Sequence, residues 1–148
     1  GYCTRRTTGQ VYAFGVTAIS QLETAYAQNG RDIQAYIDTI RQGKLYTRRG
    51  YQLTRQEQIV REVIEQMMCN YHLSWSEIAG RIGITPAEVK AATNYDEGKL
   101  REMEADGLIQ LSDDAVAMTS IGSPFVRNVV ATLDPLMQHT DKKFSKPV

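Results

Sequence analysis

The chain has 148 residues, of which 42% are hydrophobic and 23% charged, and this balance predicts a packed core rather than a disordered segment. Its formal net charge is +0, so composition gives no reason to expect nucleic acid or an anionic membrane surface as a partner. No apolar run is long enough to span a bilayer and no secretory leader is recognisable, so we expect a cytoplasmic protein. The length suits one domain, or one domain and part of another.

The chain begins with an uncharged stretch, VYAFGVTAIS, only ten residues from its N-terminus. We interpret 11–16 as a strand buried on both faces, with Gly15 allowing a close approach of backbone or ligand. Thr17 and Ser20 would place hydroxyl groups at the end of that strand. Because a strand needs neighbours and the next strand pattern follows only after Gly107, the chain is predicted to be a piece of a larger protein.

A helix is predicted from Arg31 to Gln42, where Gly43 ends the pattern, and Lys44–Tyr51 is interpreted as a connector. The next helix, Thr54–Tyr71, opens with a capping box formed by Thr54 and Glu57. Its apolar stripe is assigned to core packing rather than to a methionine-rich binding groove. The apolar positions of the two helices are Ile33, Tyr36, Ile37 and Ile40 in the first, and Ile59, Val60, Val63, Ile64, Met67 and Met68 in the second.

Three short helices follow, at 75–82, 85–92 and 96–106, and each carries clear start or stop signals. Two strands, Leu108–Leu111 and Val116–Thr119, then flank a turn and predict a β-hairpin. A last helix opens at Ser123. The helix signals are Ser74 with Glu77, Thr85 with Pro86 and Glu88, Asp96, Gly83 and Gly107; the inward positions of the last helix are Phe125, Val126, Val129, Val130 and Leu133.

The string WSEIAGRIGITPAEV resembles a helix-turn-helix, and the order of elements around it is that of a winged-helix module. DNA binding would need several cations on one face, because each neutralised phosphate adds affinity by releasing counterions. The predicted recognition helix offers only Lys90, and Asp113 and Asp114 lie at the tip of the hairpin. We therefore predict no nucleic-acid partner and interpret the module as a structural or protein-contact domain.

Six short strings in register resemble the C-terminal third of oxygen-independent coproporphyrinogen III oxidase, a radical S-adenosylmethionine family. The resemblance runs from Gly1 to about Met137. It implies a mainly α fold with a β-hairpin, in which 51–138 form a winged-helix-like C-terminal domain. Residues 1–50 would be the last strand and helix of a truncated β/α barrel, and 139–148 a flexible tail. The strings are FGVTAIS (14–20), YAQN (26–29), RGYQLT (49–54), REVIEQMMCNY (61–71), DGLI (106–109) and FVRN (125–128).

The resemblance implies an enzyme of haem biosynthesis that oxidatively decarboxylates two propionates of coproporphyrinogen III to vinyl groups, giving protoporphyrinogen IX. Such enzymes hold a [4Fe–4S] cluster on a C-x-x-x-C-x-x-C motif in an N-terminal barrel and cleave S-adenosylmethionine to a radical. This chain lacks the motif. Neither Cys3 nor Cys69 has a neighbouring cysteine, and with His72 and His139 they form no metal-ligand pattern, so we interpret them as idle thiols. We expect no metal or cofactor bound to this chain, no catalytic residue within it and no activity from it alone.

Matching by position, the isoleucine that contacts S-adenosylmethionine in the family corresponds to Ile19, with Ala18 beside it. The alternative for Ile19 is a plain filler of the barrel. The substrate carries four carboxylates, so Arg49 and Arg127 are candidate substrate contacts, the alternative being arginines that simply face water. The family's Gly-Arg pair before FVRN is replaced here by Gly122 and Ser123.

Two other functions stay open. A related haem chaperone shares the radical-enzyme architecture but binds haem, although MMCNYHL resembles the oxidase more closely. An independent winged-helix regulator or adaptor would not need the strand at 11–16. We expect that strand, without its barrel, to be disordered, folded onto the helices or paired with another copy of the chain. The substrate would be reached only through the barrel outside this chain.

Overall fold

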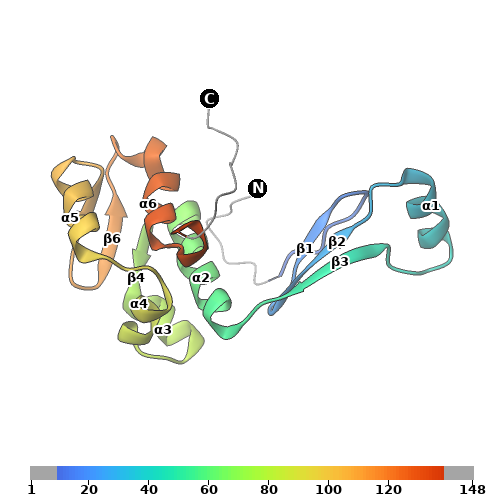
Figure 1. The fold of residues 1–148 in the computed structure, drawn as a ribbon, viewed down its shortest axis with the longest axis horizontal. Helices are drawn as coiled ribbons and strands as arrows, with labels where there is room; N and C mark the ends of the chain where they lie inside the picture. The colour runs from blue at the N-terminus through green and yellow to red at the C-terminus, as the bar shows by residue number, and fades with distance from the viewer. Residues whose placement is uncertain (1–9, 139–148) are drawn as a thin grey trace. The chain divides into compact units, whose positions relative to one another are not determined.

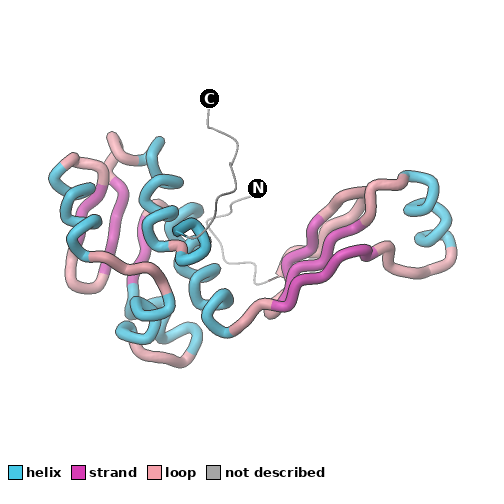
Figure 2. Tube along the Cα trace, viewed as in Figure 1, coloured by secondary structure: helices cyan, strands magenta, loops and turns pink. Residues whose placement is uncertain are grey.

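A computed structural model describes residues 10–138. Its described residues divide into two compact units, which we call the sheet unit (10–58) and the helical unit (59–138). The sheet unit contains three strands and the helix α1, and the elements from α2 onward lead into the helical unit (Figures 1 and 2). The boundary falls inside helix α2 (Arg55–Asn70), so each unit is described by itself.

The sheet unit is a three-stranded antiparallel sheet in the order β1-β2-β3. Helix α1 connects β2 to β3 and lies at one end of the strands (Figure 1). The Asp32 side chain caps α1 by accepting from the Ala35 backbone N–H at 2.9 Å. The predicted first helix is therefore confirmed. The bounds are β1 Ile19–Gln21, β2 Ala25–Asn29, α1 Ile33–Arg41 and β3 Thr47–Gln52.

The predicted strand at 11–16 is wrong. Val11 forms only an isolated antiparallel bridge with Gln21, and regular strand structure begins eight residues later. The physical reason is a tight turn, in which Gly15 and Thr17 both have positive φ, at 104° and 60°. A run of apolar residues thus forms a folded loop instead of a buried strand.

The predicted connector at 44–51 is also wrong, because most of it forms β3. The expectation of an N-terminal strand without partners is wrong as well, because β1 pairs within a three-stranded sheet. All six β3 side chains are exposed, so the sequence TRRGYQ shows no alternation between apolar and polar residues. Every strand pair within 10–138 is antiparallel. The truncated β/α barrel therefore stays a prediction.

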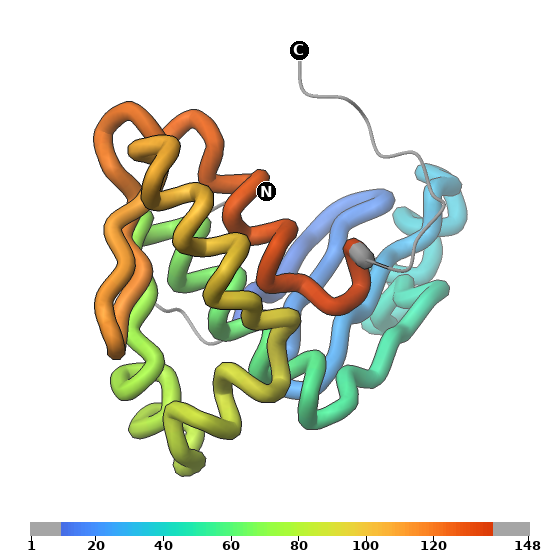
Figure 3. Tube along the Cα trace, turned by 60° about the vertical axis from the view of Figure 1, so that its left-hand side comes forward, coloured from blue at the N-terminus to red at the C-terminus, as the bar shows by residue number. Residues whose placement is uncertain are grey.

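The helical unit contains α2 and four further α-helices, with a small antiparallel sheet in the order β4-β6-β5. The predicted hairpin is confirmed as β5 and β6, and α5 lies alongside it (Figures 1 and 3). The third strand, β4, was not predicted. The bounds are β4 His72–Ser74, α3 Trp75–Ile82, α4 Pro86–Ala92, α5 Glu97–Ala105, β5 Ile109–Leu111, β6 Ala115–Met118 and α6 Val126–Leu133, with 3₁₀ turns at Ser123–Phe125 and Pro135–Gln138.

The predicted helix caps of this unit form as expected. The Ser74 hydroxyl accepts from the Glu77 N–H at 3.1 Å, and Gly83 ends α3 with a φ of 72°. The capping box of α4 is complete: the Glu88 carboxylate accepts from the Thr85 N–H at 2.7 Å, and the Thr85 hydroxyl accepts in return.

One contiguous core lies in the helical unit, and the stripe of α2 packs into it, with Met67 fully buried. The sequence predicted Phe125 to point inward, and this is wrong. Phe125 belongs to the 3₁₀ turn before α6 and is 47% exposed. The buried core residues are Ile59, Val63, Met67, Leu73, Trp75, Ile78, Ala79, Val89, Ala92, Leu100, Ile109, Val116, Val126, Val129, Val130 and Leu133.

Within residues 10–138, every helix is too short or too polar to cross a membrane.

Candidate functional site

Two of the predicted site residues lie in one row across the sheet unit. Ile19 on β1 pairs with Gln28 on β2, and Gln28 pairs with Arg49 on β3. Directly opposed residues in antiparallel strands point to the same face, so Ile19 and Arg49 share a face with one strand between them. The strand spacing places their backbones roughly 10 Å apart. Both side chains are exposed, and a ligand on this face could touch both.

Ala18 is fixed by the neighbouring strand. Its carbonyl accepts from the Asn29 backbone N–H at 2.9 Å, which extends the β1–β2 ladder by one residue. Ala18 itself is half-buried. Because successive side chains along a strand alternate between faces, Ala18 points to the face opposite Ile19, and only Ile19 shares its face with Arg49.

The loop before Ala18 is held by side chains from elsewhere in the sheet unit. The Gly15 N–H donates to the Tyr36 hydroxyl at 3.0 Å, and the Gly15 carbonyl accepts from Asn29 Nδ2 at 2.8 Å. The Thr17 N–H donates to the Gly30 carbonyl at 2.9 Å. Both polar groups of Gly15 are thereby satisfied, and the loop is ordered by specific contacts rather than by burial.

An aromatic stack supports these contacts. The rings of Tyr36 and Tyr46 meet edge-to-face with centroids 5.8 Å apart, and Arg48 lies 4.7 Å from the Tyr46 ring centroid. Gly30 is required beneath the Tyr46 ring, since a Cβ at that position would come within 2.7 Å of it. Tyr46 is buried, so the stack fixes the Tyr36 hydroxyl that binds the loop.

Arg127 belongs to the helical unit. It lies in the first turn of α6 with an exposed side chain, next to the buried Val126. Because Arg127 and Arg49 are both exposed, the guanidinium group of each could pair with a carboxylate of a ligand that approaches from solvent. Neither arginine has a role assigned by the structure, and both remain candidate substrate contacts.

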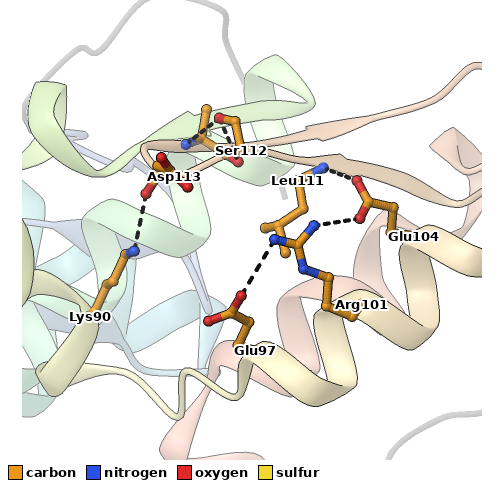
Figure 4. Close-up of polar contacts among 8 residues, drawn as sticks. Lys90, Glu97, Arg101, Glu104, Leu111, Ser112 and Asp113 are labelled. Atoms are coloured by element: carbon orange, nitrogen blue, oxygen red, sulfur yellow. Dashed lines mark hydrogen bonds and ion pairs between the residues drawn. The ribbon is translucent and has the colours of Figure 1, made fainter.

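The predicted recognition helix α4 presents no free cation. Lys90 Nζ donates to the Asp113 carbonyl at 3.2 Å (Figure 4). It also lies 4.8 Å from the ring centroid of Tyr95 and 5.5 Å from that of Trp75. The only basic side chain of this helix is therefore engaged within the unit. A DNA phosphate would have to displace these contacts.

The hairpin tip is likewise used internally. The Asp114 carboxylate accepts from the Ser76 hydroxyl and N–H at 2.6 and 2.9 Å and from the Ser74 hydroxyl at 2.7 Å. These hydrogen bonds, led by that from the Ser76 hydroxyl, lower the pKa of Asp114, and the Lys90 charge acts in the same direction. The tip of the hairpin thus anchors the start of α3.

A second carboxylate fixes the hairpin from the side of α5 (Figure 4). Glu104 accepts from the Leu111 N–H at 2.7 Å and pairs with Arg101 at 2.9 Å, while Arg101 also reaches Glu97 at 3.4 Å. The Leu111 N–H, followed by Arg101, lowers the pKa of Glu104. These polar groups stabilise the fold and form no catalytic arrangement.

The described residues do not fit an iron–sulfur cluster. Within 10–138 there is no group of three or more histidine, cysteine, aspartate or glutamate side chains that could hold a metal ion. Cys69 lies half-buried on α2, and Cys3 and His139 fall outside the described residues.

Residues 53–125 match a family model described as the HemN C-terminal domain. An oxygen-independent coproporphyrinogen III oxidase from Helicobacter pylori (strain J99) is 33% identical over 146 residues, which cover 99% of this chain and 31% of the relative. The oxidase from Thermostichus vulcanus is 31% identical over 150 residues, covering 100% of this chain and 45% of the relative.

One solved structure is similar to this chain in both fold and sequence. It is coproporphyrinogen III oxidase (HemN) from Escherichia coli, described as a radical SAM enzyme. The match has a TM-score of 0.68 and 29% identity, and covers 86% of this chain and 29% of that one. The resemblance found in the sequence is therefore confirmed, and this chain spans less than half the length of these relatives.

Sequence reasoning missed the residues that hold the loop, namely Asn29, Tyr36 and Tyr46. Tyr36 was assigned to an apolar helix face, and Asn29 appeared only as part of a matching string. The available signal was an asparagine and a glycine at the end of a strand, a pair that often carries side-chain contacts to a turning backbone. Its partner, Gly15, is fourteen residues away in sequence.

Proposed function

We propose that this chain is the C-terminal part of an oxygen-independent coproporphyrinogen III oxidase of the radical S-adenosylmethionine class. The observation that carries the proposal is the match of 86% of the chain to the E. coli enzyme, at a TM-score of 0.68 and 29% identity. The reaction would be the oxidative decarboxylation of two propionate side chains of coproporphyrinogen III. The [4Fe–4S] cluster would be held by another part of the enzyme, where with S-adenosylmethionine it supplies the radical chemistry.

The sheet unit would contribute to the cofactor and substrate sites. Ala18 and Ile19 would contact S-adenosylmethionine, Ile19 through an exposed apolar side chain. Arg49, on the same face of the sheet, would pair with a substrate carboxylate, as would Arg127 from α6. The first two contacts rest on position-by-position similarity, and the arginines on charge and exposure.

The helical unit would be a winged-helix-like module that contacts protein rather than DNA. Its order of elements supports this proposal, and so does the engagement of Lys90 by Asp113, Tyr95 and Trp75. Titrating the chain with random duplex DNA at about 0.05 M salt should give no binding of the strength expected from several phosphate contacts. Tight binding that weakens steeply as salt increases would instead favour a nucleic-acid function.

The enzymatic proposal is tested with a hybrid protein in which this chain replaces the corresponding C-terminal part of the E. coli HemN protein. We expect the hybrid to form protoporphyrinogen IX and carbon dioxide under anaerobic conditions with S-adenosylmethionine and a reductant. The matched control is the E. coli part without any replacement for its C-terminal segment, which should be inactive. A hybrid that folds and carries its cluster but shows no turnover would contradict the proposal, and haem binding by it would favour the chaperone family.

A further inference from the structure

The side chain of Phe14, in the loop before β1, is almost fully exposed to solvent. Phe14 is 89% exposed, in a unit whose buried apolar side chains among the described residues are Tyr46 and Leu53. A phenylalanine this exposed contributes little to folding, because its apolar surface stays in water. Its exposure therefore asks for another explanation than packing within the sheet unit.

The loop that carries Phe14 is fixed rather than slack. The residue after it, Gly15, is bound through its N–H by the Tyr36 hydroxyl at 3.0 Å and through its carbonyl by Asn29 Nδ2 at 2.8 Å. One residue before, the Ala13 N–H donates to the Ser20 hydroxyl at 3.0 Å. Hydrogen bonds on both sides of Phe14 hold its backbone, so little freedom would be lost when a ligand packs against the ring.

The same loop contains a backbone conformation that is unfavourable by itself. Thr17 has a φ of 60°, which a β-branched residue rarely adopts, and its N–H is bound to the Gly30 carbonyl at 2.9 Å. Such a conformation persists only where surrounding contacts impose it, and these cases gather at ligand-binding sites.

Asn29 links the loop to the proposed cofactor edge. Its side chain donates to the Gly15 carbonyl at 2.8 Å, and its backbone N–H donates to the Ala18 carbonyl at 2.9 Å. Phe14 and Ile19 are each one residue from a carbonyl held by this asparagine. Asn29 thereby ties the loop that displays Phe14 to the start of the strand that carries Ile19.

We propose that Phe14 is a ligand-contacting residue and that Asn29 and Tyr36 are positioning residues that hold its loop. The ligand chemistry is a flat ring face, against which a phenylalanine ring packs favourably. In the proposed enzyme, two molecules offer such a face: the adenine of S-adenosylmethionine and a single pyrrole ring of the porphyrinogen substrate, whose macrocycle as a whole is not flat. The inference rests on the proposed function and adds to it a contact residue and its support.

The first test is Phe14→Ala in the hybrid enzyme. Because the side chain is exposed, the variant should keep the stability and cluster absorbance of the parent hybrid. We expect about a tenfold increase in the dissociation constant of S-adenosylmethionine or in the KM for coproporphyrinogen III, with kcat changed by less than about twofold. The parameter that changes identifies the ligand. If both constants stay at the parent value, the proposal is overturned.

The second test addresses the positioning residues in this chain by itself, through hydrogen exchange of the loop amides. Asn29→Asp keeps the shape of the side chain but removes the amide donor to Gly15, and Tyr36→Phe removes the hydroxyl that binds the Gly15 N–H. Each should speed exchange at Gly15 and Thr17 by about tenfold. The matched control is Gln34→Ala, at an exposed position on α1 whose side chain donates to Asp38. It should leave the exchange rates of both amides unchanged.

The two tests separate the possible failures. An inactive parent hybrid would reject the proposed function, while the exchange experiment would still show whether Asn29 and Tyr36 hold the loop. An active hybrid whose Phe14→Ala variant binds both ligands normally would reject the role of Phe14 alone. Unchanged exchange in Asn29→Asp and Tyr36→Phe would reject the positioning role.

Discussion

The two units of the molecule are stabilised in different ways. The helical unit has a core of sixteen buried residues drawn from all of its α-helices and from its three strands. The sheet unit buries Tyr46 and Leu53 and is otherwise held by strand ladders, an aromatic stack and hydrogen bonds to one loop. The contrast shows that an ordered element need not be a well-buried one.

A matched pair of isoleucines on helices gives the largest expected difference between the units. Ile78→Ala on α3 removes a fully buried side chain and should lower the free energy of unfolding of the helical unit by about 3 kcal/mol. Urea unfolding followed by the fluorescence of Trp75, the single tryptophan, measures this loss.

Ile33→Ala on α1 is the control. Its side chain is 64% exposed, so hydrogen exchange of the α1 amides should change by less than about 0.5 kcal/mol. Equal losses would mean that the units do not differ as described.

A glycine pair tests how closely the helical unit is packed. A Cβ at Gly122 would lie 1.8 Å from the Leu108 carbonyl oxygen, and backbone cannot move aside as a side chain can. Gly122→Ala should therefore destabilise the unit by about 2 kcal/mol or more in the same urea experiment. In the matched control, Gly80→Ala on α3, the added methyl group meets open space and should stabilise by about 0.5–1 kcal/mol. A neutral Gly122→Ala would contradict the packing of this turn against Leu108.

A substitution in the aromatic stack tests the stability of the sheet unit in the same way. Tyr46→Leu removes the edge-to-face contact with Tyr36 and the stacking of Arg48, at an expected loss of about 1 kcal/mol in local stability. Hydrogen exchange of the β2 and β3 amides should accelerate accordingly. The Trp75 fluorescence transition should stay in place, because it reports on the helical unit. A shift of that transition would show that the two units unfold together.

The smallest expected effect concerns pH and Asp114. Its hydrogen bonds lower its pKa in the folded state, so it contributes stability above the carboxyl pKa of the unfolded chain, about 4, and that contribution disappears as pH falls through the folded value. Asp114→Asn should lose at most about 1 kcal/mol at pH 7, because the group is close to solvent, and nothing more on acidification. Comparing urea unfolding at pH 7 and pH 3 measures the difference. An identical pH dependence in the variant and the parent would exclude this role for Asp114.

The sequence predicted most of the helical unit because its signals are local. Capping residues such as Thr85 act on a backbone N–H three positions away, and apolar spacing of three and four residues defines one face of a helix. The same approach failed for β3, whose exposed side chains carry no pattern, and for Phe125, where a 3₁₀ turn shifts the start of the helix. In the candidate site, Ala18 and Ile19 were proposed from similarity to a family and Arg49 from the carboxylates of the implied substrate, and none of the residues that hold the neighbouring loop was predicted.

By itself, the sequence determined the positions of the helices, the hairpin and the resemblance to the HemN C-terminal domain. Only the tertiary structure decided that Ile19 and Arg49 share a row, that Lys90 is held by two rings and a carbonyl, and that Asn29 ties Gly15 to Ala18. The physical reason is the distance over which each signal acts. A cap or a helix face depends on neighbours within one or two turns, whereas strand register and loop contacts join residues whose separation along the chain carries no information about their pairing.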